Sequence, residues 1–290
     1  MKKVFTGLLM CWGNFCYIPG PRKWDEEARP YMLAWLPTVG FIMGLIWGLL
    51  AILILKLQLP YLAAAAFLVW VPFVISGFIH VDGYMDVNDA LMSRGDLQKK
   101  RTILKDSRCG TFAIVSFVFL VLIEFGSMAS FVDPGVGQSF KPFMDALINS
   151  GLLQFFSQGM GNGLINAMMG GHSSGTILMY FAVIMTVPRA VSGFLMMNLE
   201  PMETSQYRTM LKDTGAAVFM AVQLLVLLII AHSVCPRVDR FGLMAIMILS
   251  FLGSLISCFI ARHQLKGMNG DIAGYGILWG ELLGMIGLLI

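Results

Sequence analysis

The stretch from His80 to Asp89 carries the densest group of polar side chains in the sequence. On a helix, Asp82, Asp86 and Asp89 fall within about 60° of arc and therefore share one face. Carboxylates held this close repel one another unless a cation, or several Lys and Arg, neutralises them. Oxygen-only ligands suit Mg²⁺ or Mn²⁺, which leave positions for substrate phosphates. The spacing indicates a metal and phosphate site, with a solvated acidic helix end as the alternative.

Two neighbours of these carboxylates are also candidates for the site. Gly83 follows the first Asp, and a glycine at this position permits the close approach of a bulky ligand. His80 falls on the opposite face of the same helix. A lone His in this setting is more often a hydrogen-bonded structural residue than a general base.

A second polar group lies between Lys105 and Thr111. We expect Lys105 and Arg108, three residues apart, to share a helical face, with Ser107, Gly110 and Thr111 at the start of the following helix. Such an arrangement would form a phosphate cradle opposite a cation held by the Asp residues. The alternative is a set of cations that simply flanks a membrane span.

Four further charged residues stand out. Asp271 lies in a glycine-rich turn, where a helix N-cap is the favoured interpretation and a further metal or nucleophile-binding carboxylate is the alternative. Glu124, Arg189 and Glu281 interrupt otherwise apolar runs. Charges inside a membrane are costly, so each is a candidate functional or pairing residue.

The composition indicates the class of fold that positions these residues. The chain is 57% hydrophobic and 13% charged, whereas globular proteins are about 45–50% apolar and about 25% charged. We predict an all-α, polytopic integral membrane bundle that forms one domain over residues 1–290. Runs of roughly 20 apolar residues predict seven transmembrane helices, near 36–55, 57–79, 109–132, 175–199, 214–231, 241–261 and 272–290.

The charge distribution predicts the orientation of the bundle. With an inner N-terminus and seven spans, 15 of the 20 Lys and Arg lie on the cytoplasmic side, as the positive-inside rule favours. These are Lys2, Lys3, Arg22, Lys23, Arg29, Arg94, Lys99, Lys100, Arg101, Lys105, Arg108, Arg208, Lys212, Arg262 and Lys266. The uncharged but Gly- and Asn-rich segment from Ala146 to Gly171 is expected to be re-entrant or superficial. The site would then face the cytoplasm from an inner, multi-pass membrane location.

Other features of the chain exclude some functions. The net charge of +3 indicates no nucleic-acid partner. Five scattered Cys suggest neither a disulfide framework nor a zinc site. The segment from Met1 to Ile18 is interpreted as an interfacial amphipathic helix rather than a signal peptide.

With these motifs identified, the chain resembles the adenosylcobinamide-GDP ribazoletransferase (cobalamin synthase) family from about Phe15 onward. Three blocks carry the resemblance. They are His80-Val81-Asp82-Gly83 with Asp86 and Asp89, Lys105-Asp106-Ser107-Arg108-Cys109-Gly110-Thr111, and Gly270-Asp271-Ile272-Ala273-Gly274 with Gly280-Glu281-Leu282. Ala90, Asn269 and Leu278 depart from the family pattern, and the stretch from Pro134 to Ser174 is longer than usual.

The resemblance implies a Mg²⁺-dependent reaction at the membrane. AdoCbi-GDP and α-ribazole, or its 5′-phosphate, would give adenosylcobalamin, or its 5′-phosphate, plus GMP. The lipid bilayer, other cobalamin-assembly enzymes and a second copy of the chain are the remaining candidate partners.

We assign roles by the chemistry of phosphoryl transfer, which depends on positioning and charge neutralisation. Asp82, Asp86 and Asp89 would hold one or two Mg²⁺ ions, and Lys105 and Arg108 would stabilise the transferring phosphoryl group and departing GMP. Asp106 or Asp271 would orient or deprotonate an attacking 5′-oxygen. The substrate-binding candidates are His80, Gly83, Ser107, Thr111, Arg189, Asp271 and Glu281.

Competing hypotheses use the same residues differently. A CDP-alcohol phosphotransferase also has an Asp-rich helix, but its D-x-x-D-G-x-x-A-R pattern is missing. A prenyltransferase would normally need a second Asp cluster. A cation transporter could use Asp82, Glu124 and Glu281 as a path, although the sequence contains no convincing internal repeat.

Overall fold

The computed structural model describes residues 2–106, 108–133, 173–203, 205–208, 210 and 212–289. The expected re-entrant segment from Ala146 to Gly171 lies outside these residues, as does Ser107. Within the described part the chain is helical, and its single β-bridge joins Pro201 to Met268. Six helices are long and apolar enough to cross a membrane, and a bent pair makes up to seven. The chain is therefore a multi-pass helical membrane protein.

The helices follow the predicted spans closely, with one exception. They are α1 (Lys2–Phe15), α2 (Arg29–Ala34), α3 (Leu36–Lys56), α4 (Tyr61–Ile75), α5 (Ile79–Met92), α6 (Leu97–Ile103), α7 (Thr111–Val132), α11 (Ser174–Asn198), α12 (Thr214–Val234), α13 (Arg240–Leu265) and α14 (Gly270–Ile286). Six of the seven predicted spans are found, as α3, α7, α11, α12, α13 and α14.

The expected span from 57 to 79 is wrong as a single straight helix. Helix α4 ends at Ile75, and the chain bends by 92° before α5 begins at Ile79. Gly77 and Phe78 produce the bend, since both have a left-handed backbone with φ of 62° and 60°. Glycine enters this region without the steric cost that other residues pay. The bend starts a new helix one turn before the acidic residues.

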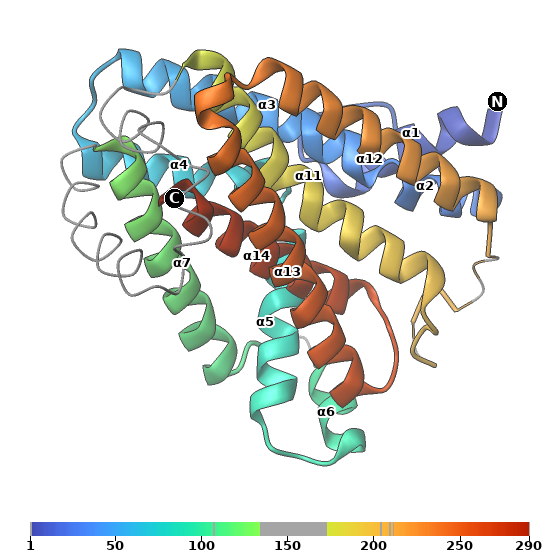
Figure 1. Cartoon of the computed structure of the whole chain (residues 1–290). Coiled ribbons are helices and arrows are strands. Elements are labelled where there is room, and N and C mark those ends of the chain that lie inside the picture. The colour runs from blue at the N-terminus through green and yellow to red at the C-terminus, as the bar shows by residue number, and fades with distance from the viewer. Residues whose placement is uncertain are drawn as a thin grey trace, which may run out of the picture.

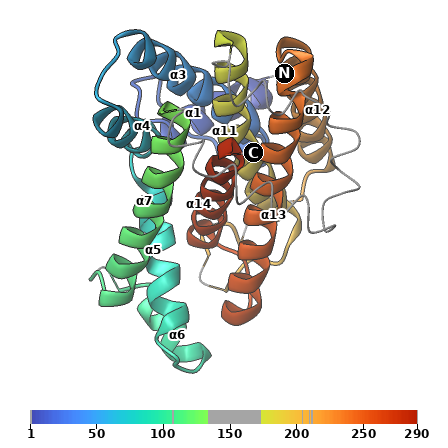
Figure 2. The ribbon, with the colours of Figure 1, turned by 60° about the vertical axis from the view of Figure 1, so that its left-hand side comes forward.

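Helix α11 forms the centre of the bundle, and 89% of its most apolar window is buried. Figure 2 shows α11 and α14 in the middle, with α5 and α7 on one side and α12 and α13 on the other. On α3, Gly40, Gly44 and Gly48 face the backbone of α11, and a Cβ at Gly44 would lie 2.5 Å from the Ala182 Cα. Small residues let two membrane helices approach this closely.

Helix α1 is amphipathic, as predicted. Met10 and Cys11 are fully buried, whereas Phe5 on the other face is 62% exposed. The indole N–H of Trp35 donates to the Val4 carbonyl at 2.8 Å. The first helix is therefore packed onto α2 and onto the junction between α2 and α3.

The cationic loops meet at one end of the bundle, where α5 and α6 lie close to the end of α13 (Figure 1). The Lys100 ammonium donates to the Gln264 side chain at 2.7 Å. Arg29 lies over the Tyr207 ring, 5.3 Å from its centroid. Loops predicted from charge alone to share one side of the membrane are thus in contact.

Replacing Gly44 with Leu should separate α3 from α11 and lower the stability of the protein by about 1–3 kcal/mol or more. The measurement is the thermal unfolding midpoint of the purified protein in detergent. Gly126→Leu is the matched control, because no heavy atom of the residues that the structure describes lies within 4 Å of a Cβ at Gly126. Equal midpoints for the two variants would contradict the packing described for α3 and α11.

Candidate functional site

The three predicted Asp residues share one face of α5, and a fourth carboxylate joins them. Asp86 interacts electrostatically with Asp82 and Asp89 on its own helix and with Asp271 on α14. Asp82 is exposed, and Asp86, Asp89 and Asp271 are partly buried. We call these four residues the acidic face. Four like charges in mutual range need a cation or protons to coexist.

Gly83 brings the fourth carboxylate into place. A Cβ at Gly83 would lie 2.8 Å from the Asp271 Cα, and one at Gly274 would lie 3.2 Å from the His80 Cα. The expectation that Gly83 admits a bulky ligand is wrong, because the start of α14 already fills that space. The glycine permits close helix packing instead, and this packing places Asp271 beside Asp82.

Asp271 is not a helix N-cap, contrary to the favoured sequence interpretation. Asn269 caps α14 by accepting a hydrogen bond from the Ile272 amide at 3.0 Å. The Asn269 amide nitrogen also donates to Asp271 Oδ2 at 2.7 Å. One Asn therefore ends the turn, starts the helix and orients Asp271. An Asn three residues before the first buried residue of a helix is a recognisable capping signal, and the sequence interpretation missed it.

The side chain of Asp89, on α5, lies beside the first turn of α7. Its Oδ1 accepts a hydrogen bond from the Ala113 amide at 3.3 Å, and Gly110 leaves room for its other oxygen. The positive end of a helix dipole stabilises a carboxylate here. Asp89 is therefore both part of the acidic face and the residue that holds α7 against α5.

The predicted cradle residues lie in the linker between α6 and α7, residues 104–110, which we call the basic loop. Lys105 and Arg108 are both exposed, but they do not share a helical face as expected, because α6 ends at Ile103. The Arg108 guanidinium pairs with Asp106 at 2.8 Å. Thr111 is the exposed first residue of α7, and Ser107 lies outside the described residues.

Hydrogen bonds from the Arg108 side chain and backbone lower the pKa of Asp106 to about 2. A carboxylate with so low a pKa is a weak proton acceptor near neutral pH. Asp106 is consequently the poorer of the two predicted candidates for a general base, and Asp271 is the better one.

His80 is buried, with 4% of its surface exposed. Its ring stacks on Phe15 of α1, with the two planes 7° apart. Among the described residues neither ring nitrogen has a hydrogen-bond partner. The interpretation of His80 as a hydrogen-bonded structural residue is therefore wrong, and the side chain points away from the acidic face, as predicted.

The charged residues inside the bundle lie apart from the acidic face. Arg189 on α11 and Glu281 on α14 form an ion pair, and both are almost fully buried. Arg189 Nη1 also donates to the Met185 carbonyl at 2.8 Å. Glu124 on α7 is fully buried, and neither of its carboxyl oxygens has a partner among the described residues. Arg189 and Glu281 are thus pairing residues that join two central helices.

The acidic face fits Mg²⁺ by the chemistry of its donors. In the described part of the chain, no three His, Cys, Asp or Glu side chains converge tightly enough to hold a metal on their own. Mg²⁺ does not require such convergence, because it usually takes one or two carboxylates and fills its other positions with water and phosphate oxygens. The donors are all oxygens, which excludes the sulfur and imidazole sets that favour zinc.

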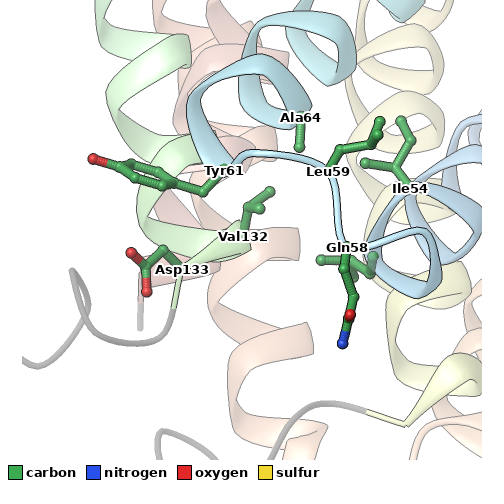
Figure 3. Close-up of a pocket in the computed structure, with 8 residues that line it drawn as sticks. Ile54, Gln58, Leu59, Tyr61, Ala64, Val132 and Asp133 are labelled. Atoms are coloured by element: carbon green, nitrogen blue, oxygen red, sulfur yellow. The ribbon is translucent and has the colours of Figure 1, made fainter.

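A pocket of about 220 Å³ lies far from these residues. Figure 3 shows Ile54 of α3 and Gln58 and Leu59 of the α3–α4 connection opposite Val132 and Asp133 at the end of α7. Helix α7 begins beside Asp89 and runs for 22 residues, which is about 33 Å at 1.5 Å per residue. This pocket is therefore at the opposite end of the bundle from the acidic face.

Comparison with known proteins gives consistent matches. A family model described as cobalamin-5-phosphate synthase matches residues 7–289. The adenosylcobinamide-GDP ribazoletransferase of Clostridium perfringens (strain 13 / Type A) is 27% identical over 99% of this chain and 98% of its own length. That of Clostridium botulinum (strain Alaska E43 / Type E3) is 28% identical over 98% and 97%. A Halalkalibacterium halodurans protein of the same name is 38% identical over 42% of this chain and 47% of its own. No solved structure matches the chain.

Replacing Glu281 with Gln should lower the unfolding free energy substantially, by about 3–5 kcal/mol, because it leaves the buried Arg189 charge without its partner. The measurement is the thermal unfolding midpoint in detergent. Glu124→Gln is the control, since this side chain makes no hydrogen bond or ion pair with the described residues that the substitution would break. A larger loss for Glu124→Gln than for Glu281→Gln would refute the pairing.

Proposed function

Because the chain belongs to the cobalamin-5-phosphate synthase family, we propose that it joins AdoCbi-GDP to α-ribazole or its 5′-phosphate. The products are adenosylcobalamin, or its 5′-phosphate, and GMP. The observation that carries this proposal is the acidic face, in which α5 and α14 bring four carboxylates together beside the cationic loops. Such a face suits a diphosphate substrate, whose charge requires a bridging cation.

The bond changes follow from the substrates. A ribose hydroxyl of the acceptor forms a P–O bond to the phosphorus on the corrinoid side of the diphosphate. The bond to the distal phosphate breaks, and GMP departs. The acceptor's 5′-phosphate persists in the product, so the attacking oxygen is a ribose hydroxyl other than the 5′-oxygen expected from the sequence.

The residues of the chain divide this work between them. Asp82 and Asp86 would bind Mg²⁺, which when bound neutralises the diphosphate and the charge that develops on departing GMP. Asp89 keeps one oxygen on the α7 amide and would add its negative charge to the site that holds the ion. Asp271, oriented by Asn269, is placed to accept the proton of the attacking hydroxyl.

The basic loop would bind the phosphates from the other side. Lys105 is exposed and supplies a mobile point charge, while Arg108 presents a planar fork that matches two phosphate oxygens. In the free enzyme the Asp106 carboxylate occupies that fork. Substrate phosphate would compete with Asp106 for the guanidinium. Until then, the ion pair with Asp106 would hold the Arg108 side chain in place while it stays exposed.

The orientation in the membrane follows from charge. We place the acidic face at the cytoplasmic side of the inner membrane, because the loops in contact around it hold most of the Lys and Arg of the chain. This placement brings the site to the compartment where a nucleotide-activated substrate and Mg²⁺ are abundant.

Asp82→Asn and Asp86→Asn should each abolish GMP release from a GDP-activated corrinoid, because a neutral amide oxygen is a weaker ligand than a carboxylate and does not balance the charge of Mg²⁺. The measurement is GMP formed by detergent-purified protein with α-ribazole as acceptor. Asp213→Asn is the control, since Asn caps a helix as well as Asp does and Asp213 caps α12. Normal turnover in either active-site variant would remove the metal assignment, and ion flux in vesicles without GMP release would favour a transporter.

Removing divalent ions with EDTA should stop turnover, and excess Mg²⁺ should restore it. Ca²⁺ should restore far less, because it prefers longer bonds and more ligands than Mg²⁺. GMP release at a series of free Mg²⁺ concentrations measures this directly. Full activity in EDTA would show that the acidic face is neutralised in another way.

A further inference from the structure

Arg101 lies in the last turn of α6 and reaches across to the end of α13. Its Nε donates to the Leu265 carbonyl at 3.2 Å, and its Nη2 donates to the Lys266 carbonyl at 3.0 Å. Its third nitrogen, Nη1, is 3.4 Å from the Glu203 carboxylate. One partly buried guanidinium on α6 therefore contacts two segments that are distant from it in sequence, the end of α13 and the loop at Glu203.

The two carbonyls lie at the end of α13, in the turn that leads to α14. The last carbonyls of a helix have no partner within the helix. Here α13 ends in an unusual backbone, with φ of 56° at Lys266 and 151° at Gly267. Gly267 is pressed against Met202, since a Cβ would lie 2.6 Å from that side chain. Arginine near a helix C-terminus can supply the missing donors.

This turn leads directly into the acidic face. Met268 exchanges backbone hydrogen bonds with Glu200 and Met202, at 3.0 and 2.9 Å. The next residue, Asn269, orients Asp271, which approaches α5 at Gly83. The path from the Arg101 guanidinium to the Asp271 carboxylate is therefore a continuous series of short-range contacts.

Arg101 also lies immediately before the basic loop. Helix α6 ends at Ile103, two residues after Arg101, and Lys105 follows almost at once. The same side chain thus anchors the loop that carries Lys105 and Arg108 and the turn that carries Asp271. Arg101 therefore fixes the position of the basic loop relative to the acidic face, although its side chain contacts neither.

We propose that Arg101 is a positioning residue that holds Asp271 in the acidic face by clamping the α13–α14 turn. The expected kinetic effect rests on the proposed function, whereas the expected structural effect rests only on the contacts of Arg101. Lysine cannot replace Arg101 fully, because an ammonium lacks the planar fork that serves two carbonyls and a carboxylate together.

The first experiment compares Arg101→Gln with the wild type in GMP release and in Mn²⁺ binding measured by electron paramagnetic resonance. Loss of a residue that supports metal ligands typically lowers metal affinity or activity by about 10–100-fold. Asp271 adds its negative charge to the face that would bind the cation, so we expect Arg101→Gln to raise the Mg²⁺ concentration for half-maximal activity by about tenfold and to weaken Mn²⁺ binding in parallel. Arg101→Lys should be intermediate, and the KM for α-ribazole should stay unchanged.

Lys100→Ala is the matched control. It removes one positive charge from the same helix, and its partner is the side chain of Gln264 on the same end of α13. It leaves the turn carbonyls and Asp271 untouched. An effect of Lys100→Ala equal to that of Arg101→Gln would assign the loss to surface charge and overturn the proposal.

Hydrogen–deuterium exchange tests the clamp without any reaction. Arg101→Gln should speed exchange at the amides of residues 268–273 and leave the central helix α11 protected. Faster exchange throughout the protein would indicate general destabilisation and refute a positioning role.

A double-mutant cycle with Asp271→Asn tests the path itself. If Arg101 acts through Asp271, Arg101→Gln should change Mn²⁺ affinity by less than about twofold in the Asp271→Asn background, since coupled residues are not additive. Full additivity would overturn the proposal. Wild-type protein that never releases GMP would refute the proposed function instead, and the exchange and Mn²⁺ experiments would still decide the role of Arg101.

Discussion

The mutual repulsion of carboxylates packed between two helices is the constraint on which this site depends. Helices α5 and α14 approach until their backbones touch at Gly83 and Gly274, and this approach places Asp271 within range of Asp82 and Asp86. Like charges disfavour such packing. Such carboxylates coexist only where a cation or protons reduce their charge, and the Mg²⁺ proposed above would couple the packing of the two helices to metal binding.

The rest of the bundle provides a rigid support for that contact. Helix α11 packs on α3 through glycines and on α14 through the Arg189–Glu281 pair. A buried ion pair contributes little net stability compared with apolar packing, yet it strongly opposes any register that separates its partners. The first turn of α14 carries Asp271, so a shift of α14 by one residue along α11 would misplace this carboxylate. The Arg189–Glu281 pair opposes such a shift.

Much of the site could be predicted from the sequence. The spacing of Asp82, Asp86 and Asp89 requires only a helix to place them together, and helical periodicity is a local property. The six long spans follow from hydropathy in the same way. The bend at Gly77 and Phe78 could not be foreseen, because apolar residues continue across it and the left-handed backbone is stabilised by surrounding structure. The cradle geometry also failed, since α6 ends before Lys105 and no local pattern marks that end.

The sequence by itself determined a helical membrane protein, the cationic side of its loops and one face of three carboxylates, because these depend on composition and on spacing within one segment. Only the tertiary structure decided that Asp271 completes that face and that Arg189 pairs with Glu281. The more distant of these pairs, Asp82 and Asp271, is separated by 189 positions in the chain. Chain spacing carries no information about which helices pack together, whereas the close approach of glycine-lined helices selects the partners.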